Sequence, residues 1–351
     1  MKVPATQLNE ITRILNTVKA DSLVFAGSAA YAVGTNITAC VHCPDIGVFG
    51  VGAEKFSQVT ARLDGDIDIT LLNGLGKEEV NEPLVTQIAI KSKRSKFKLP
   101  IIASPQVPKI VLPGNPVAVL DLKQFNEIVS YAASASETGQ QFSYTGAINL
   151  SGNGQRISAV GTDGRRLAVI DAENAAPQFS FIMPVQVIPV IKALRGDTVS
   201  VYQDSASLYF QSGGATIIAR QLAKTFPSHE SIIAKSFSIK SKIPAQEMKE
   251  ALRRVAPVVD PESDRVLLTV SDTNVIINTV GNLGSAEDEI PATSIESDPL
   301  FDTFKFAIKH HQLLEFFDEV SGDVVLNANS EGQPIYLEAG ARKLLCASLK
   351  S

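Results

Sequence analysis

The sequence predicts an α+β fold in which three related domains follow one another along the chain. The main evidence is a unit that occurs three times: an amphipathic helical stretch, a Gly-Asp turn and a strand of alternating residues. The turns lie about 130 residues apart, a spacing that suits whole domains rather than a short solenoid repeat. The first unit has a helical stretch at 55–63, the turn Gly65-Asp66 and a strand at 67–70. The second has 187–194, Gly196-Asp197 and 198–201, and the third has 313–317, Gly322-Asp323 and 324–326, in the same order of helix, turn and strand.

A similar helix opens each predicted domain. The three matching segments are Leu8-Asn9-Glu10-Ile11, Phe125-Asn126-Glu127-Ile128 and Met248-Lys249-Glu250-Ala251. Apolar residues at helical spacing predict the first helix over 6–18, and a further helix is expected over 246–255, after Pro244. Short strands are expected between 21 and 51, where Ala, Val, Gly and Thr recur without helical period. Two helices among many strands in each domain indicate helices that cover one face of antiparallel sheets.

Two connecting stretches divide the chain into predicted domains 1–113, 114–236 and 237–351. The first stretch, 100–116, contains five prolines and reads as an extended connector. The second runs from Phe226 to Ser241 and carries few signals of regular structure.

Composition limits the class of protein. The 351 residues, 44% of them hydrophobic, supply enough apolar material for three cores. A net charge of -5 excludes a protein that is basic over its whole surface, although a segregated basic surface stays possible. No apolar run approaches a membrane span, the amino-terminal residues lack the apolar stretch of a secretory signal, and three cysteines suit a reducing compartment. A cytoplasmic location is expected.

The motifs that resemble catalytic or metal sites are incomplete. Cys40-Val41-His42-Cys43 has the spacing of a redox or zinc site, but a structural zinc needs four ligands, so we interpret these as ordinary strand residues. The segment 74–78 lacks the first glycine and the Ser or Thr of a phosphate loop, and is expected to connect strands. His310 and His311 are expected at a helix start. The sequence therefore predicts no catalytic residue, no metal and no cofactor.

The basic segment from Lys91 to Leu99 admits two interpretations. It could bind nucleic acid, because an aromatic residue stands among lysines and arginines. Its alternation favours an edge strand, with Phe97 and Leu99 on one face and Arg94, Lys96 and Lys98 on the other. The acidic run Glu287-Asp288-Glu289 offers a complementary partner, so head-to-tail pairing would close two chains into a ring.

Residues 159–168, which contain Thr162-Asp163-Gly164-Arg165-Arg166-Leu167-Ala168, resemble the Thr-Asp-Gly-His-Arg-Leu-Ala motif of the bacterial sliding clamp, the beta subunit of DNA polymerase III. Residues 221–227 look like a shortened form of the family's Lys-Leu-(four residues)-Phe-Pro element, and 94–99 are similar to its Arg-Ser-Arg-Phe-Ser-Leu strand. The resemblance implies three clamp domains, with helices lining the inside of a ring and antiparallel sheets outside.

The resemblance also implies a function. Members of this family form a ring-shaped homodimer around double-stranded DNA, without reading its sequence, and tether DNA polymerase and other replication and repair proteins for processivity. A sliding ring should carry Lys and Arg on its lining helices. The candidate DNA-facing residues are Arg13, Lys19, Lys55, Arg62, Lys123, Lys192, Arg195, Lys249, Arg253, Arg254 and Lys309. Glutamates share these helices, so a plain solvated helix face is the alternative.

By the same resemblance, polymerase, clamp loader and repair proteins bind through short linear peptides in an apolar pocket between the second and third domains. The implied wall residues are Thr162, Gly164, Arg165, Arg166, Leu167, Pro227, Ile232, Leu345, Ala347 and Leu349. The chain ends Leu345-Cys346-Ala347-Ser348-Leu349-Lys350-Ser351 where the family commonly ends Met-Pro-Met-Arg-Leu, and Ala347 in place of a methionine should alter the pocket's shape.

The implied dimer contact sets Phe97 and Leu99 of one chain against Pro257 and Val258 of the other. Lys96 and Lys98 would face Glu287, Asp288 and Glu289 across the joint. Two further hypotheses stay open: a clamp-like adaptor that binds peptides but does not close stably around DNA, and an enzyme built on this fold.

Overall fold

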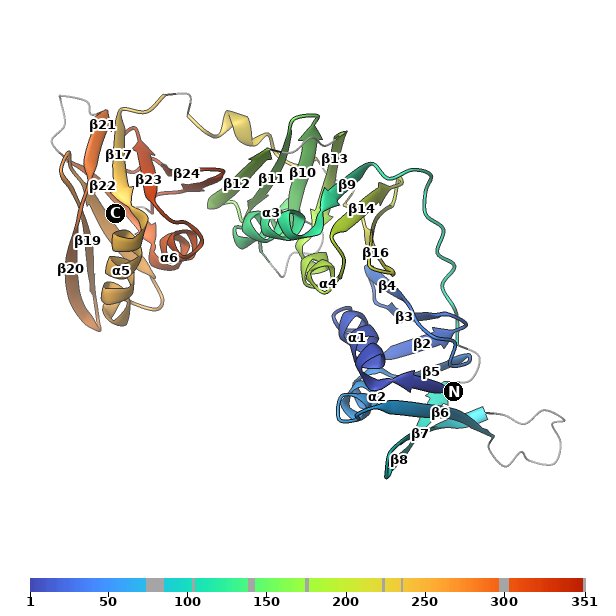
Figure 1. Ribbon diagram of the computed structural model, residues 1–351. Helices are drawn as coiled ribbons and strands as arrows, with labels where there is room; N and C mark the ends of the chain where they lie inside the picture. The colour runs from blue at the N-terminus through green and yellow to red at the C-terminus, as the bar shows by residue number, and fades with distance from the viewer. Residues whose placement is uncertain are drawn as a thin grey trace. The chain divides into compact units, whose positions relative to one another are not determined.

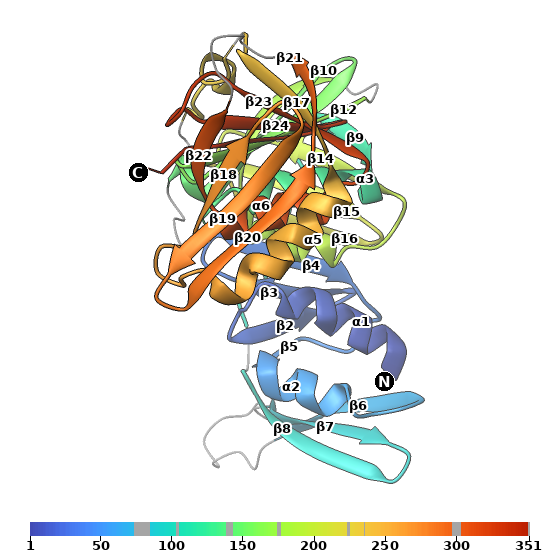
Figure 2. The same cartoon turned by 90° about the vertical axis from the view of Figure 1, so that its left-hand side faces the viewer.

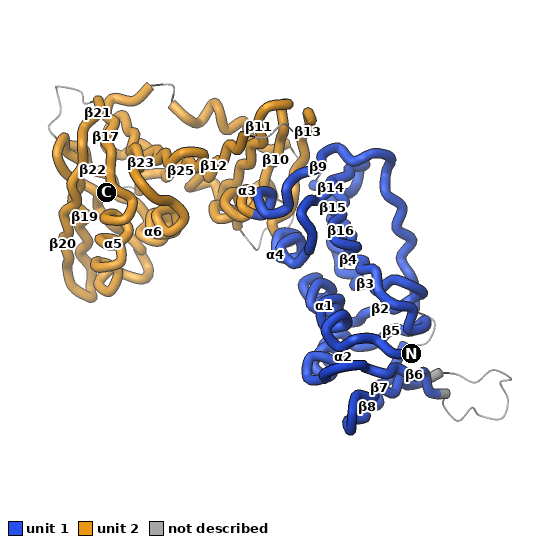
Figure 3. The backbone as a smooth tube through the Cα atoms, viewed as in Figure 1, with its two compact units in different colours: residues 1–126, 186–223 blue, residues 127–185, 224–351 orange. Residues whose placement is uncertain are grey.

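The computed structural model describes residues 1–73, 85–102, 105–137, 143–173, 177–222, 225–234, 236–296 and 303–349. The chain forms two compact units, one of residues 1–126 and 186–223, the other of residues 127–185 and 224–351 (Figure 3). The predicted loop 74–78 lies outside the described residues.

One order of elements occurs three times along the chain. It is a strand and a helix, then four strands and a second helix, then three strands. In the first repeat the elements are β1 (Lys2–Pro4), α1 (Ala5–Asn16), β2 (Ser22–Ala26), β3 (Ala29–Val33), β4 (Ile37–His42), β5 (Phe49–Gly52), α2 (Ala53–Thr60), β6 (Asp66–Asn73), β7 (Val85–Ser92) and β8 (Ser95–Ile102).

The second repeat contains the same order, with short 3-10 turns before β10 and α4. Its elements are β9 (Ala118–Asp121), α3 (Leu122–Ser134), β10 (Ala147–Asn153), β11 (Arg156–Thr162), β12 (Arg166–Glu173), β13 (Gln178–Pro184), α4 (Ile188–Lys192), β14 (Thr198–Gln203), β15 (Ser207–Ser212) and β16 (Ala215–Arg220).

The third repeat adds one short strand, β21, which pairs with β17. Its elements are β17 (Ile239–Pro244), α5 (Ala245–Val255), the 3-10 turn η4 (Ala256–Val258), β18 (Arg265–Val270), β19 (Asn274–Gly281), β20 (Gly284–Pro291), β21 (Thr293–Glu296), β22 (Phe304–Lys309), α6 (His310–Glu319), β23 (Asp323–Ala328), β24 (Ile335–Ala339) and β25 (Arg342–Cys346). A second 3-10 turn, η3 (His229–Ser231), precedes this repeat. The α+β fold with threefold repetition is confirmed.

The repeated Gly-Asp turn ties the two helices of each repeat together. The glycines at 65, 196 and 322 have φ of +68°, +114° and +76°, in the left-handed region that glycine adopts without steric penalty. The first amide of the opening helix donates a hydrogen bond of 2.8 Å to this turn in every repeat: Ala5 to the Gly65 carbonyl, Leu122 to the Asp197 carbonyl, Ala245 to the Gly322 carbonyl. The turn thus satisfies an amide that would otherwise lack an intrahelical partner.

Antiparallel strands join neighbouring repeats into continuous sheets. In the first unit β4 pairs with β16, from Ile37 opposite Ala219 to Val41 opposite Ala215. In the second unit β12 pairs with β25, from Arg166 opposite Cys346 to Ile170 opposite Arg342. Each joint therefore links the third strand after the first helix of one repeat to the last strand of the next repeat.

The helices pack on the sheets in pairs. In the first unit α1 lies beside α2, and in the second α5 lies beside α6 and against β19 and β20 (Figures 1 and 2). Leu8, Ile11 and Leu15 of α1 are buried, as their spacing predicts. Phe25, Phe49 and Phe56 form an aromatic cluster, in which the ring centroid of Phe25 lies 5.0 Å from that of Phe49 and 5.3 Å from that of Phe56. Each such buried ring contributes about 1.5–3 kcal/mol through removal of apolar surface from water.

The prediction for the basic segment was partly wrong. Strand β8 begins at Ser95, so Arg94 lies in the turn that joins β7 to β8 rather than on the strand. Ser92 pairs with Ser95, and Lys93 takes a φ of +49°, which closes a two-residue hairpin. The alternation within β8 is confirmed, because Lys96 and Lys98 are exposed while Phe97 and Leu99 are half-buried.

Substituting Gly161 with Ala is expected to lower the free energy of unfolding by about 3 kcal/mol or more. A Cβ atom at this position would lie 1.9 Å from the carbonyl oxygen of Ala132 on α3, so strand β11 and the helix would have to separate. Denaturant titration measures the loss. Gly52→Ala is the matched control, because nothing lies within 4 Å of its Cβ position and its φ is not positive. An equal effect of the two substitutions would contradict the expected clash.

Candidate partner-binding site and nucleic-acid face

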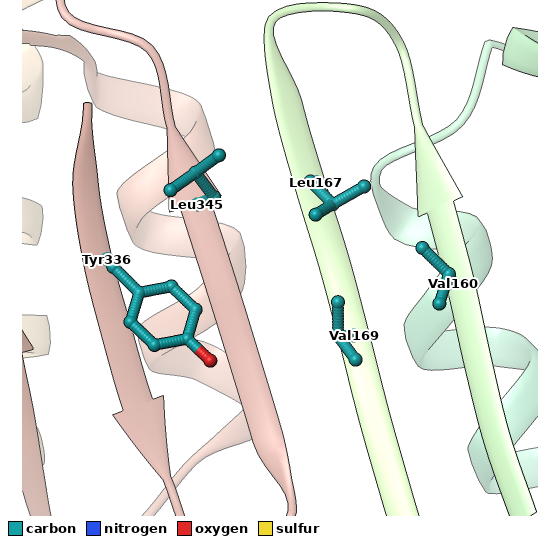
Figure 4. Packing of buried hydrophobic residues seen from close by; sticks show 5 residues of the cluster. All are labelled: Val160, Leu167, Val169, Tyr336 and Leu345. Atoms are coloured by element: carbon teal, nitrogen blue, oxygen red, sulfur yellow. The ribbon is translucent and has the colours of Figure 1, made fainter. Parts of the chain in front are cut away.

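An apolar cluster lies on one face of the sheet around the β12–β25 joint. Its buried members are Val160, Leu167, Val169, Tyr336 and Leu345, from four adjacent strands (Figure 4). Leu167 and Leu345 stand directly opposite each other in the joint. Because alternate residues of a strand share a face, Leu167 and Val169 of β12 both contribute.

The chain segment before the third repeat packs on this cluster. Phe226, Ile233 and Phe237 are partly buried against it. The Phe237 ring stacks on Tyr336 at 5.7 Å, and Phe226 meets the Tyr144 ring edge-on at 6.2 Å. Apolar and aromatic side chains from strands and from an irregular segment thus meet on one surface, which is the composition expected of a site for apolar peptide side chains.

The turn between β11 and β12 forms a rigid border of the cluster. The Thr162 hydroxyl donates to the Arg166 carbonyl at 2.6 Å and accepts from the amide of Gly164 at 3.0 Å. The Asp163 carboxylate accepts from the amides of Arg165 and Arg166, both at 2.9 Å. Gly164 has a φ of +86°, which explains a glycine at this position.

Arg166 links this turn to helix α6. Its guanidinium donates to Asp163 at 3.2 Å and to Glu315 at 2.5 Å, and its side chain is only 11% exposed. Two carboxylates therefore compensate a nearly buried positive charge, which fixes Arg166 beside Leu167.

The end of the chain borders the same region. The amide of Ala347 donates to the Arg165 carbonyl at 2.8 Å, and the amide of Leu349 donates to the Ala307 carbonyl at 2.7 Å. Ala347 is exposed and Leu349 is half-buried. Cys346, the last residue of β25, is fully buried, and burial raises the pKa of its thiol to about 12.

The structure brings together most, but not all, of the pocket residues implied by the sequence. Leu167 and Leu345 lie in the cluster, and Thr162, Gly164, Arg165 and Arg166 form the adjoining turn. Pro227 is exposed and Ile232 is 52% exposed, whereas their neighbours Phe226 and Ile233 pack on the cluster. One sequence signal could have identified Phe226 and Ile233 as members of the site: they are large apolar residues in a segment without regular structure.

A polar cavity of about 590 Å³ adjoins the cluster and shares Val169 and Ile233 with it. Lys343 donates to Asp171 inside this cavity at 2.8 Å. Burial alone would raise the pKa of Asp171, but hydrogen bonds from Lys343 and Ser158 outweigh it, so the pKa lies below its usual value. The remaining lining residues are Ser151, Asn153, Arg156, His229, Glu230 and Ala234.

His229 makes the stability of this region depend on pH. Burial lowers the pKa of His229 from 6.5, although Glu230 and Asp171 oppose the shift. The unfolded chain therefore takes up a proton at this residue before the folded chain does, and the free energy of unfolding should fall as the pH drops below about 6.5 toward the folded pKa. Denaturant titrations between pH 7.5 and 5 should show a shallower fall for His229→Gln. Equal slopes for the two proteins would contradict this expectation.

Several candidate DNA-facing residues take part in contacts within the chain. The Arg13 guanidinium donates to the Ala193 carbonyl at 2.9 Å, and Arg195 lies 3.7 Å from Glu10. On α5, Lys249 and Arg253 both pair with Asp318, at 3.1 and 2.8 Å, and Arg254 pairs with Asp288 at 2.6 Å. Lys309 donates to the Ser263 carbonyl at 2.5 Å.

The other candidate cations keep their charges unpaired. Within the described part of the chain, no ion pair forms at Lys19, Lys55, Arg62, Lys123 or Lys192, and all five are exposed. Lys19 follows α1, Lys55 lies on α2 and Arg62 follows it. Lys123 lies on α3 and Lys192 on α4.

The candidate dimer residues lie on two sheet edges. Residues 95–100 of β8 pair with β7 on one side only, because β5 reaches only Ile101 and Ile102. Strand β20 ends the four-stranded sheet β20-β19-β18-β22. Glu287 and Glu289 on β20 are exposed, and Asp288 is half-buried beside Arg254. Pro257 is exposed and Val258 half-buried in η4, near the β19–β20 hairpin whose Val280 and Leu283 are 78% and 57% exposed.

The structure places the cysteines and histidines of the incomplete motifs on or beside a strand and at a helix start. Cys40 lies on β4 and Cys43 just beyond it, both as free thiols, and burial raises the pKa of Cys43 to about 11. His310 and His311 begin α6, as expected; the ring of His310 contacts the Leu252 carbonyl at 2.8 Å and that of His311 contacts Asp264. Among the described residues, no group of three or more His, Cys, Asp or Glu side chains is arranged to hold a metal ion.

Together, the three repeats of strands and paired helices and the sheet joints between them define a three-repeat clamp fold. The chain is similar to the beta sliding clamp of Synechococcus elongatus, with 23% identity over 308 residues, covering 83% of this chain and 77% of that protein. Crystal structures of the DNA polymerase III beta subunits of Thermotoga maritima and Pseudomonas aeruginosa superpose with TM-scores of 0.86 and 0.84, each at 14% identity and covering 100% of this chain and 99% of the other. No family model matches the chain. Over most of its length the chain is therefore similar in sequence, and over its whole length in fold, to bacterial sliding clamps.

Within the described residues, none of the helices has both the length and the apolar character needed to cross a membrane.

Proposed function

We propose that this chain is a DNA sliding clamp: two copies close into a ring around double-stranded DNA and tether DNA polymerase and other replication and repair proteins. It acts in the cytoplasm as a non-catalytic processivity factor. Its domains are the three repeats, with boundaries near residues 113 and 236. The single observation that carries the proposal is the pair of sheet edges left over after the internal joints are made.

At both internal joints, the third strand after the first helix of one repeat pairs with the last strand of the next repeat. In three repeats this leaves one such third strand and one such last strand outside the two joints. The strands β4 and β12, each third after the first helix of its repeat, pair with β16 and β25, each last in the next repeat. The remaining strands of these two kinds are β20 and β8. Among the described residues, β20 and residues 95–100 of β8 each present an edge with no partner strand. A second copy of the chain supplies the missing partner for each edge, and two such joints close a ring of six repeats.

Charge and apolar surface support this pairing. The edge of β8 carries Lys96 and Lys98, and that of β20 carries Glu287 and Glu289. Exposed pairs of this kind contribute roughly 0 to 1 kcal/mol each, so they orient the joint rather than hold it. Apolar burial supplies most of its stability, through Phe97 and Leu99 on one side and Pro257 and Val258 on the other.

DNA binding would depend on cations of the helices. The unpaired charges of Lys19, Lys55, Arg62, Lys123 and Lys192 are available to phosphates, whereas cations that already pair with carboxylates contribute less. Because phosphate contacts carry no base information, such a surface holds DNA without sequence preference.

The apolar cluster around Leu167 and Leu345 would receive the partner peptides. Buried aliphatic and aromatic side chains, bordered by the rigid turn 162–167, suit apolar residues of a short linear segment. The exposed Ala347, in place of a long side chain, leaves this border open, so the preferred peptide should differ from that of clamps with a methionine there.

Retention on circular DNA tests the ring directly. A closed ring stays on nicked circular DNA through a salt wash that removes electrostatic binding, and it leaves when a restriction enzyme linearises the circle. The assay loads purified protein with a clamp loader and follows bound protein by gel filtration before and after cleavage. Release that depends on salt alone, and not on linearisation, would contradict the ring.

A clamp-like adaptor that binds peptides without closing around DNA is the second candidate. The observation in its favour is that each of the α5 cations Lys249, Arg253 and Arg254 pairs with a carboxylate, the first two sharing Asp318 and the third pairing with Asp288. The same circular-DNA assay separates the two, because an adaptor would bind a labelled peptide and show no topological retention.

A further inference from the structure

The first internal joint contains a contact between helices beside its paired strands. At the first joint α1 of the first repeat reaches the end of α4 of the second repeat (Figure 3). The Arg13 guanidinium donates a hydrogen bond of 2.9 Å to the carbonyl of Ala193, the residue that caps α4. A cation at the carboxyl end of a helix is favourable because the last carbonyl groups carry partial negative charge.

At the second joint the opening helix also contacts the next repeat, but through strand β25. Helix α3 of the second repeat reaches the third repeat, where the Tyr131 hydroxyl donates to the Lys343 carbonyl at 3.0 Å. Tyr131 also lies close enough to Glu319, at the end of α6, for that carboxylate to help raise the pKa of Tyr131, behind the larger effect of burial. At both joints the opening helix of one repeat thus contacts the next repeat, and at the first joint it contacts the end of the second helix there.

We propose that the joint between subunits contains the same helix contact, made by Arg253 of one subunit and the turn after α2 of its partner. This inference rests on the proposed dimer. Arg253 follows Met248 by five residues as Arg13 follows Leu8, so the two arginines hold equivalent positions on the opening helices. Ala193 precedes the turn glycine Gly196 by three residues, and the equivalent residue of the first repeat is Arg62, three before Gly65.

The residues at both ends suit this contact. The Arg253 side chain is 57% exposed and pairs with Asp318 of its own chain, and Lys249 can keep Asp318 paired if Arg253 leaves. The turn after α2 offers the Arg62 carbonyl and the carboxylate of Asp64, which is 83% exposed and 3.7 Å from Lys93. Arg253 would therefore meet a helix end with a negative carboxylate. Further charges on these two elements are Glu250 and Arg254 on α5, which lie 3.9 Å apart, and the exposed Arg62 side chain after α2.

The dimer dissociation constant, measured by light scattering through a dilution series, tests this contact. Arg253→Gln should raise that constant at least tenfold, since a ring contains the contact twice, and Asp64→Asn should raise it by a smaller factor. The double variant should match Arg253→Gln rather than the product of the two effects, because both substitutions remove one interaction. Lys123→Gln is the control, since it removes an exposed cation from the opening helix of another repeat, and it should change the constant less than twofold.

Two outcomes would overturn the inference, and they are distinguishable. If the natural chain is a dimer and Arg253→Gln leaves its dissociation constant unchanged, the helix contact is wrong while the paired strands stand. If the natural chain stays monomeric at all concentrations, the proposed ring and this contact fall together.

Discussion

The substitution Val258→Asp is expected to leave the chain monomeric at micromolar concentration. Val258 is half-buried in η4, beside the exposed Pro257 and the exposed Val280 and Leu283 of the β19–β20 hairpin. In the proposed dimer these side chains pack against Phe97 and Leu99 of the partner. A carboxylate placed there loses its water without gaining a partner, a cost of at least about 2 kcal/mol at each of two joints.

Light scattering gives a direct readout, because one chain has a mass of 37.5 kDa and a ring has twice that. Circular dichroism of the variant checks that it remains folded, as expected for a residue that only the partner would bury fully. The matched control is Val111→Asp, which introduces the same charge at a valine that is 65% exposed in the connector between the first two repeats. A Val258→Asp variant that stays dimeric would show that the interface lies elsewhere.

The second large effect is expected at Phe226. Its ring packs against the apolar cluster and meets Tyr144 edge-on, and it comes from an irregular segment rather than from a strand of the core. Phe226→Ala should weaken binding of a labelled peptide with a leucine and an aromatic residue by about 10- to 100-fold, the loss expected for an aromatic residue that carries much of a peptide contact. Fluorescence anisotropy measures the dissociation constant.

The control for this variant is Tyr209→Ala, which truncates a half-buried aromatic residue in β15 of the other unit. Its peptide affinity should equal that of the natural chain. Unchanged peptide binding by Phe226→Ala would place the peptide on another surface, whereas loss of binding by both variants would indicate general destabilisation.

The threefold repeat was predictable because its signals are local. A Gly-Asp turn needs a glycine at positive φ, and an amphipathic helix needs apolar residues every three or four positions, so both are legible in a short window of sequence. This is why α1, α5 and α6 occur close to their predicted ranges, and why the three turns at 65, 196 and 322 have the expected geometry. The edge strand at β8 was predictable in the same way, except for Arg94, since periodicity alone does not reveal where a two-residue hairpin closes.

The residues around the apolar cluster were predictable only in part. Thr162 to Leu167 form one contiguous motif, so a resemblance over six residues sufficed to name them. Phe226 and Ile233 lie in a segment without regular structure, where a shift of one residue cannot be detected from periodicity, and their neighbours Pro227 and Ile232 were named instead. The pairing of Arg166 with Glu315 joins positions far apart in the chain and left no local signal.

The sequence by itself determined the number of repeats, the approximate positions of their helices and turns, and the edge character of β8, because each depends on contacts between residues close along the chain. Only the tertiary structure decided which strands join the repeats, which edges stay open, and which cations are already neutralised by carboxylates. The ion pairs of α5 join residues 34 to 69 positions apart. The strand joints depend on residues more than a hundred positions apart, as in the pairing of Leu167 with Leu345. Such contacts form when strands from different repeats meet, and no short stretch of sequence specifies them.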